Sequence, residues 1–223
     1  MSLAILIPAR WNSTRYPGKP LAELNGVPLI KRVYDICKST GIDTYVLTDA
    51  QEIYNVIGAD CIIDRDPYEN GTERCKGAHV KKLVNYANYI NVQGDMADVT
   101  PEIIVAAVDA LKDCDVSTVY TEMPKEKQDD PNSVKMVRAD NRALWFGRGM
   151  TGYGDWHLGI YGYTATALEQ YPGVESQEEV IEKLEQIRWL KNGWQIGCKS
   201  VQYKGTEINT PEDLIEWHNK NSP

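Results

Sequence analysis

The chain has 223 residues, of which 42% are hydrophobic and 25% charged, with a formal net charge of −8 and a pI near 5.0. This composition predicts a globular protein with a sizeable core and excludes a disordered or fibrous chain. The acidic balance argues against general affinity for nucleic acid or an anionic membrane, so a polyanion would need a local basic site.

The five cysteines are scattered and never form a CxxC pair, which favours buried reduced thiols over a disulfide framework or a zinc cluster. No stretch approaches the roughly 18 uncharged residues of a membrane span. The N-terminal sequence also lacks the basic lead-in and cleavage site of a signal peptide. We therefore expect a cytoplasmic protein that binds neither nucleic acid nor membrane.

Short apolar runs alternate with helix-length amphipathic segments along the first half, a rhythm typical of α/β proteins. The runs are too short and too apolar for half-exposed hairpins. They predict a parallel sheet buried on both faces, with strands at 3–8, 44–48, 61–64, 89–92 and 116–121. Helices are expected at 28–38, 51–57, 73–84 and 101–111, the last with Thr100 as its N-cap.

After the segment KEKQDDPN the pattern changes to denser strand-like pieces, at 134–138, 143–146 and 159–163. One continuous helix is predicted over 177–192, opened by a capping box of Ser176 and Glu179 and stopped by Gly193. On one face of this helix we expect a stripe of Glu178, Glu182, Glu185 and Trp189, opposite an apolar face of Val180, Leu184 and Ile187. A last helix opens at Thr210, with a proline and acidic residues in its first turn.

The first expected strand runs directly into ARWNSTRYPGKPL, where Arg10, Arg15 and Lys19 are cationic and no acidic residue offsets them. Two prolines and a glycine restrict this loop, which lowers the entropy cost of ordering it around an anion. A solvated basic loop is the plainer interpretation of the charge alone. The position after a central strand instead favours a phosphate site, because open α/β sheets bind ligands at the carboxyl ends of their strands.

A second candidate lies in NVQGDM, at the end of the fourth expected strand. Gly94 lets a ligand approach the backbone, and the Asp95 carboxylate is a typical ligand for Mg²⁺, although an ordinary turn residue is the alternative. If the first and fourth strands are neighbours, as in the order 3-2-1-4, the basic loop and Asp95 face each other. One site for a nucleoside triphosphate with Mg²⁺ then follows.

Three other motifs are excluded by context or by absence. GRGMTG matches G-x-G-x-x-G by letter but opens no helix, so a dinucleotide site is not supported. The chain has neither a P-loop nor the G-x-S-x-G of a serine hydrolase.

Taken together, these residues resemble one known family. IPARWNSTRYPGKPL is similar to the N-terminal motif of the 3-deoxy-manno-octulosonate (Kdo) cytidylyltransferases, the CMP-Kdo synthetases, and NVQGD follows at the expected distance. Six further segments resemble that family in order: NGTER, DPNSVK, LWFGR, HLGIYGY, LEQIR and INTPEDL. The resemblance therefore covers essentially the whole chain.

The resemblance implies a GT-A-like nucleotidyltransferase of the α/β class. Its mainly parallel sheet would be flanked by helices, with a smaller mixed β sub-domain in the second half. We expect a single domain over 1–223, with a nucleotide-binding half at 1–122 and a sugar-acid-binding and dimerisation half at 123–223. A homodimer is the assembly that the resemblance implies.

The implied reaction is transfer of CMP from CTP to a sugar acid, Kdo or a close analogue, with Mg²⁺ as cofactor and pyrophosphate as the second product. The anomeric hydroxyl would attack the α-phosphorus in line, so catalysis would be mostly positioning and charge neutralisation. The positions that match the family's nucleotide-binding residues are Arg10, Ser13, Arg15, Lys19, Arg74 and Gln93. Those implied to be catalytic are Arg10, Lys19 and Asp95. The sugar-acid side matches Arg148, His157, Tyr161, Glu185 and Gln186.

The chain also departs from the family pattern. The family usually reads VDTPEDL near its end, where the aspartate shares magnesium with the one in NVQGD, but this chain has Asn209. An amide oxygen can join Asp95 as a metal ligand but brings no charge, so weaker metal affinity is expected. The segment between Arg148 and His157 is shorter than usual, which affects the acceptor side.

Two alternatives stay open. One keeps the fold and changes the substrates, as in another sugar-nucleotide pyrophosphorylase or a sialic-acid-type cytidylyltransferase. The other is a degenerate homologue that binds a nucleotide sugar without catalysis.

Overall fold

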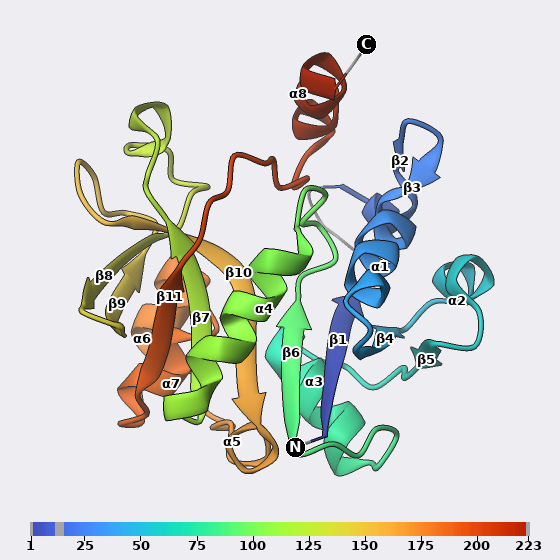
Figure 1. Cartoon of the computed structure of the whole chain (residues 1–223), viewed down its shortest axis with the longest axis horizontal. Helices are drawn as coiled ribbons and strands as arrows, with labels where there is room; N and C mark the ends of the chain where they lie inside the picture. The colour runs from blue at the N-terminus through green and yellow to red at the C-terminus, as the bar shows by residue number, and fades with distance from the viewer. Residues whose placement is uncertain (1, 12–15, 222–223) are drawn as a thin grey trace.

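A nine-stranded sheet runs through the middle of the molecule, in the order β5-β4-β1-β6-β10-β7-β11-β9-β8 (Figure 1). The computed structural model describes residues 2–11 and 16–221. The strands of this sheet are β1 (Leu3–Ala9), β4 (Asp43–Thr48), β5 (Cys61–Ile63), β6 (Asn88–Val92), β7 (Val116–Thr121), β8 (Lys135–Ala139), β9 (Arg142–Gly147), β10 (Asp155–Thr164) and β11 (Ile196–Ser200). A separate hairpin of β2 (Glu23–Leu24) and β3 (Val27–Pro28) leads into the first helix.

The strands predicted in the first half are confirmed, with ends that differ by no more than one residue. β1 pairs in parallel with β4 on one side and with β6 on the other, and β5 adds in parallel to β4. This is the expected 3-2-1-4 order. The carboxyl ends of β1 and β6 are therefore neighbours, and the loops that follow them meet.

Helices cover both faces of the sheet, with α1 and α4 in front of it and α3 behind it in Figure 1. They are α1 (Leu29–Ser39), α2 (Gln51–Ile57), α3 (Gly71–Val80), α4 (Pro101–Ala110), α5 (Ala165–Glu169), α6 (Gln177–Glu182), α7 (Ile187–Lys191) and α8 (Pro211–Asn221). Within the described residues, no helix has the length and apolar character needed to cross a membrane.

Each central strand contributes to two hydrophobic cores. Ile5 and Ile7 of β1 pack in a cluster with α1 and α4, whereas Ala4 and Leu6 pack in a second cluster with α3, α5 and α7. Successive side chains of a strand point to opposite faces, so a strand buried on both faces is apolar at successive positions. This explains the continuous apolar run of β1.

The second half joins the same sheet through β10, which lies between β6 and β7 and is antiparallel to both (Figure 1). The strand predicted at 159–163 corresponds to β10 but is too short, because β10 begins at Asp155 and pairs there with β8. The strands expected at 134–138 and 143–146 correspond to β8 and β9. β11, which pairs in parallel with β7, has no counterpart among the predicted strands.

The continuous helix predicted over 177–192 is wrong, because the chain forms α6 and α7 with a break between them. Lys183 ends α6 with a left-handed φ of 55°. At the break, the Glu182 carboxylate accepts the backbone N–H of Arg148 at 2.6 Å. Tertiary contacts of this kind override helix propensity. The expected polar face is also wrong in part, since Trp189 on that face is fully buried.

Candidate functional site

The predicted site residues gather where the loops after β1 and β6 meet the second half of the chain. Two adjoining cavities lie there, with volumes of about 520 and 200 Å³. Both are lined by Arg10, Gln93, Asp95 and Asn209, so the two spaces meet at the end of β6. A further cavity of about 620 Å³ lies at β9 and β11 and is lined by none of the predicted site residues.

The basic loop after β1 brings two cations to these cavities. Arg10 lines both, and its exposed guanidinium donates to the Glu69 carbonyl at 3.4 Å. Lys19 lines the smaller cavity, and its ammonium forms an ion pair with the Asp95 carboxylate at 2.8 Å. Ser13 and Arg15, which were also expected at this site, lie outside the described residues.

Asp95 is held in place by the backbone around it. At the preceding Gly94, a Cβ would come within 3.3 Å of the Pro8 carbonyl oxygen, so glycine lets the ends of β1 and β6 approach closely. The Asp95 carbonyl accepts the backbone N–H groups of Ala97 and Ile208, each at 3.0 Å. The side chain therefore projects from a fixed position at the junction of the two cavities.

Helix α3 carries Arg74 to the smaller cavity. The helix begins at Gly71, two residues before the predicted start, because Asn70 Oδ1 accepts the N–H of Glu73 at 2.8 Å and acts as the N-cap. Arg74 is only 5% exposed, and its guanidinium donates to the Asp64 carbonyl at 2.9 Å. This cation is thus ordered before any anion binds, which lowers the entropy cost of binding.

Gln93 lies between the cavities and is enclosed by two glycines. A Cβ at Gly71 of α3 would come within 3.0 Å of Gln93 Nε2, and a Cβ at Gly159 of β10 would come within 3.1 Å of its Cγ. Larger residues at these positions would displace the Gln93 side chain. Glycine therefore explains how α3 and β10 both approach the end of β6.

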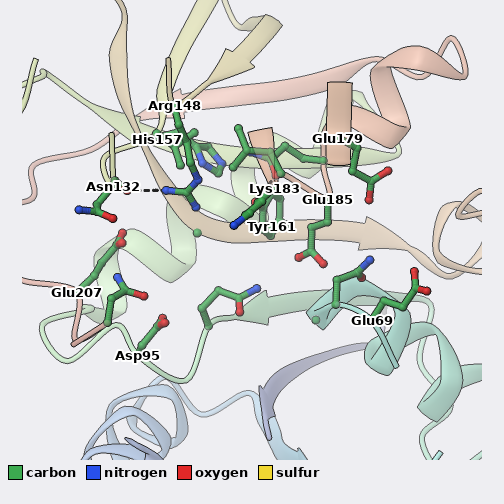
Figure 2. A pocket seen from close by; sticks show the side chains of 18 of the residues that line it. Glu69, Asp95, Asn132, Arg148, His157, Tyr161, Glu179, Lys183, Glu185 and Glu207 are labelled. Carbon is green, nitrogen blue, oxygen red and sulfur yellow. Dashed lines mark hydrogen bonds between the residues drawn. The ribbon is translucent and has the colours of Figure 1, made fainter. Parts of the chain in front are cut away.

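Arg148 follows β9 and reaches the larger cavity, as Figure 2 shows. Its Nε donates to the Glu182 carbonyl at 3.2 Å, and one terminal nitrogen donates to the Asn132 carbonyl at 2.6 Å. Both of these acceptors are carbonyl oxygens, and together they fix the orientation of the guanidinium. The break after α6 therefore positions Arg148, which the sequence predicts to bind an anion.

His157 on β10 lines the same cavity and is 3% exposed. Thr118 Oγ1 lies 2.9 Å from His157 Nε2 and donates to the Ile160 carbonyl at 2.8 Å. Since that hydroxyl has one proton, it accepts from Nε2–H, which leaves Nδ1 as the unprotonated ring nitrogen. Burial, and to a lesser degree the charge of Arg148, lowers the pKa of His157 to about 3, so the ring is neutral at neutral pH.

The remaining acceptor-side residues form a buried polar group. The Tyr161 hydroxyl donates to Gln186 Oε1 at 3.1 Å, while Gln186 Nε2 has no partner within the described part of the chain. The Glu185 carboxylate accepts the backbone N–H of Thr72 at 3.1 Å, and burial raises its pKa to about 7. Every predicted site residue that the structure describes thus lines one or both cavities.

Several charged or polar lining residues were not among the predicted site residues: Asn132, Glu179, Lys183 and Glu207. Glu207 lies at the same end of the larger cavity as Asp95 (Figure 2). Burial, and next the charge of Asp95, raises the pKa of Glu207 to about 7. Only one feature of the sequence could have identified Glu207 as a site residue: it precedes Asn209 by two positions. In an extended segment this spacing places both side chains on the same face.

The chain is similar to known proteins along most of its length. Residues 4–200 match the family model described as Cytidylyltransferase. The 3-deoxy-manno-octulosonate cytidylyltransferase of Parabacteroides distasonis is 34% identical, over 94% of both chains. The 8-amino-3,8-dideoxy-manno-octulosonate cytidylyltransferase of Shewanella pealeana is also 34% identical, over 96% of both chains.

Solved structures support the same grouping. A CMP:2-keto-3-deoxy-manno-octonic acid synthetase complexed with CTP has a TM-score of 0.88 and 30% identity, covering 99% of this chain and 98% of that one. The inositol-1-phosphate CTP transferase from T. maritima has a TM-score of 0.69 at 13% identity, and shares the fold alone. The expected α/β nucleotidyltransferase fold is confirmed.

Proposed function

This chain belongs to the cytidylyltransferase family, and from that premise we propose that it transfers CMP from CTP to a sugar acid like 3-deoxy-manno-octulosonate. The observation that carries the proposal is the pair of cavities that meet at Gln93 and Asp95. Cations of the first half line one, and Arg148 and His157 of the second half line the other. Two anionic substrates in these spaces would bring their reacting ends together at the junction.

The smaller cavity suits the triphosphate. Arg10, Lys19 and Arg74 supply positive charge around it, and the N-terminal residue of α3, Gly71, also lines it. A helix N-terminus favours negative charge, and glycine allows close approach to the backbone. These groups offset the charge of a triphosphate in a protein whose net charge is −8.

The larger cavity suits a sugar acid. The Arg148 guanidinium is a good partner for a carboxylate, since it presents a fork of N–H donors. The neutral His157 can accept a hydrogen bond at Nδ1, because its Nε2 is paired with Thr118, whereas Gln186 Nε2 is a buried donor without a partner in the described chain. Hydroxyl groups of a sugar can both donate and accept, so they can satisfy these two groups together.

The reaction requires little covalent work from the protein. The anomeric hydroxyl oxygen attacks the α-phosphorus of CTP and forms the new C–O–P linkage. The bond from that phosphorus to the bridging oxygen breaks, pyrophosphate leaves with the electron pair, and the hydroxyl proton passes to water. Arg10 and Lys19 stabilise the charge that develops on the pyrophosphate, while the cavities hold the reacting atoms in line.

We include Mg²⁺ in the proposal because the oxygen donors at the junction fit it. Asp95, Asn209 and Glu207 line the same cavity, and Asp95 already holds a cation, the Lys19 ammonium, at 2.8 Å. The described residues contain no group of three or more histidine, cysteine or acidic ligands, so substrate phosphates would have to complete the site. When bound, Mg²⁺ would neutralise phosphate charge.

Pyrophosphate release tests the proposed function. With CTP, Mg²⁺ and 3-deoxy-manno-octulosonate, the purified protein is expected to release pyrophosphate and form a CMP-sugar of the corresponding mass. Asp95→Asn should lower the rate by roughly 10²-fold or more, because it removes the charge at the junction. Asp113→Asn, at an exposed position that lines neither of the two site cavities, is the matched control. No product from the wild-type chain, or a rate indifferent to Asp95→Asn, would contradict the proposal.

Competing substrates separate the alternatives. We expect CTP to be preferred over UTP and dTTP, and the 3-deoxy and 8-amino-3,8-dideoxy acids are the acceptors to compare. Preference for UTP or dTTP would indicate another sugar-nucleotide pyrophosphorylase. Binding of CTP without turnover of any acceptor would indicate a degenerate homologue.

The proposal extends to assembly and location. We infer a homodimer from the resemblance to the synthetases, and light scattering on the purified protein tests it. All five cysteines are free thiols, which suits the reducing conditions of the cytoplasm. Localisation of a tagged chain tests that inference.

A further inference from the structure

The segment before α8 is tied to the loop after β6 by backbone donors. The N–H of Ile208 donates to the Asp95 carbonyl at 3.0 Å, and the N–H of Thr206 donates to the Asp98 carboxylate at 3.0 Å. Ile208 itself is fully buried in the core. Since neighbouring side chains of an extended segment point to opposite sides, the residues on either side of Ile208 point toward the cavity.

Glu207 lies with Asp95 at one end of the larger cavity (Figure 2), and Asn209 lines the same cavity. Asp95 has an ionic partner in Lys19. The Glu207 carboxylate has neither a hydrogen bond nor an ion pair within the described residues. The charge that acts on it most is that of Asp95, and the positive charges of Lys127, Arg148 and Lys19 act more weakly. A half-buried carboxylate near a second one is costly unless a cation offsets the two charges.

We propose that Glu207 supplies the second carboxylate of the divalent-cation site at this junction, beside Asp95. This inference rests on the proposed function, which brings the cation and the triphosphate there. Asn209 contributes an uncharged oxygen, so Glu207 raises the negative charge of the donor set from one to two. One or two carboxylates together with substrate phosphates are the usual protein contribution to Mg²⁺ binding.

Direct metal binding tests the role of Glu207. The probe is Mn²⁺, titrated into the full chain with CTP and without a sugar acid, with free Mn²⁺ followed by electron paramagnetic resonance. Glu207→Gln is expected to weaken Mn²⁺ binding by roughly tenfold or more, because it removes one of two charges. The double variant Glu207→Gln, Asn209→Asp should regain most of the affinity. Glu212→Gln, exposed at the start of α8, is the matched control and should bind as the wild type does.

Melting curves without metal show whether each variant is folded, and the rescued double variant keeps the test valid if Glu207→Gln alone is unstable. The inference is overturned if Glu207→Gln binds Mn²⁺ as tightly as the control while Asp95→Asn does not. It is also overturned if the wild-type chain binds no Mn²⁺. Failure of the proposed function is a separate result: a wild-type chain that binds Mn²⁺ through Glu207 but forms no CMP-sugar would contradict the activity alone.

Discussion

Burial shifts the pKa values of two side chains of the larger cavity in opposite directions. It lowers the pKa of His157 to about 3 and raises that of Glu185 to about 7, because in each case the charged form loses hydration. His157 therefore acts as a neutral hydrogen-bonding ring at neutral pH. Glu185 is only partly ionised, so it can donate as well as accept a hydrogen bond. The larger cavity thus carries less charge than its residue types indicate.

The raised pKa of Glu185 predicts that this residue lowers stability as pH rises. The pKa goes from 4.5 in the unfolded chain to about 7 in the folded protein, so the folded state binds the proton more tightly. Its contribution is fully present below pH 4.5 and is lost as pH rises through 7. Glutamine does not ionise, so Glu185→Gln does not lose stability in this way. The unfolding free energy of the variant minus that of the wild type should therefore be about 1 to 3 kcal/mol larger at pH 8 than at pH 4.5.

Urea denaturation of both proteins at the two pH values measures this difference. Glu52→Gln, on the exposed side of α2, is the control and should follow the wild-type pH profile. If stability depends on pH in the same way for the wild type and for Glu185→Gln, burial does not raise the pKa of the Glu185 carboxyl group.

At the scale of elements, the break between α6 and α7 builds much of one side of the larger cavity. It directs the Glu182 carboxylate to the backbone N–H of Arg148 and the Glu185 carboxylate to that of Thr72. A continuous helix would keep these two glutamates nearly on one stripe of its surface, three residues apart. The left-handed residue at the break is Lys183, and a side chain in that conformation costs free energy.

Lys183→Gly is therefore expected to raise the free energy of unfolding by about 0.5 to 1 kcal/mol, because glycine adopts this φ without a steric penalty. Lys183→Ala keeps the Cβ and should leave that strain in place, which makes it the matched control. Guanidinium denaturation of the three proteins measures the effect. A glycine variant no more stable than the alanine variant would contradict the assigned conformation.

At the scale of the whole molecule, the sequence predicts what local burial determines and misses what distant contacts determine. The first-half strands are predictable because both of their faces are buried, and their parallel order brings Lys19 and Asp95 together. β11 is not predicted because Gly197 interrupts its short apolar stretch and its last two residues, Lys199 and Ser200, are exposed and polar. The break at Lys183 depends on Arg148, far away in the sequence, and the direction of Glu207 depends on the burial of its neighbour.

The two halves of the chain, 1–122 and 123–223, should unfold together. The sheet continues from β6 into β10 without interruption, and one core cluster contains Ile7 and Ile104 from the first half with Trp156, Ile160 and Trp217 from the second. Neither half can lose its packing alone, so calorimetry should show one transition whose calorimetric and van 't Hoff enthalpies agree. CTP at about 100 times its Kd should move this whole transition, adding about 2.7 kcal/mol. Two transitions, of which CTP moves only one, would show that the halves are separate folding units.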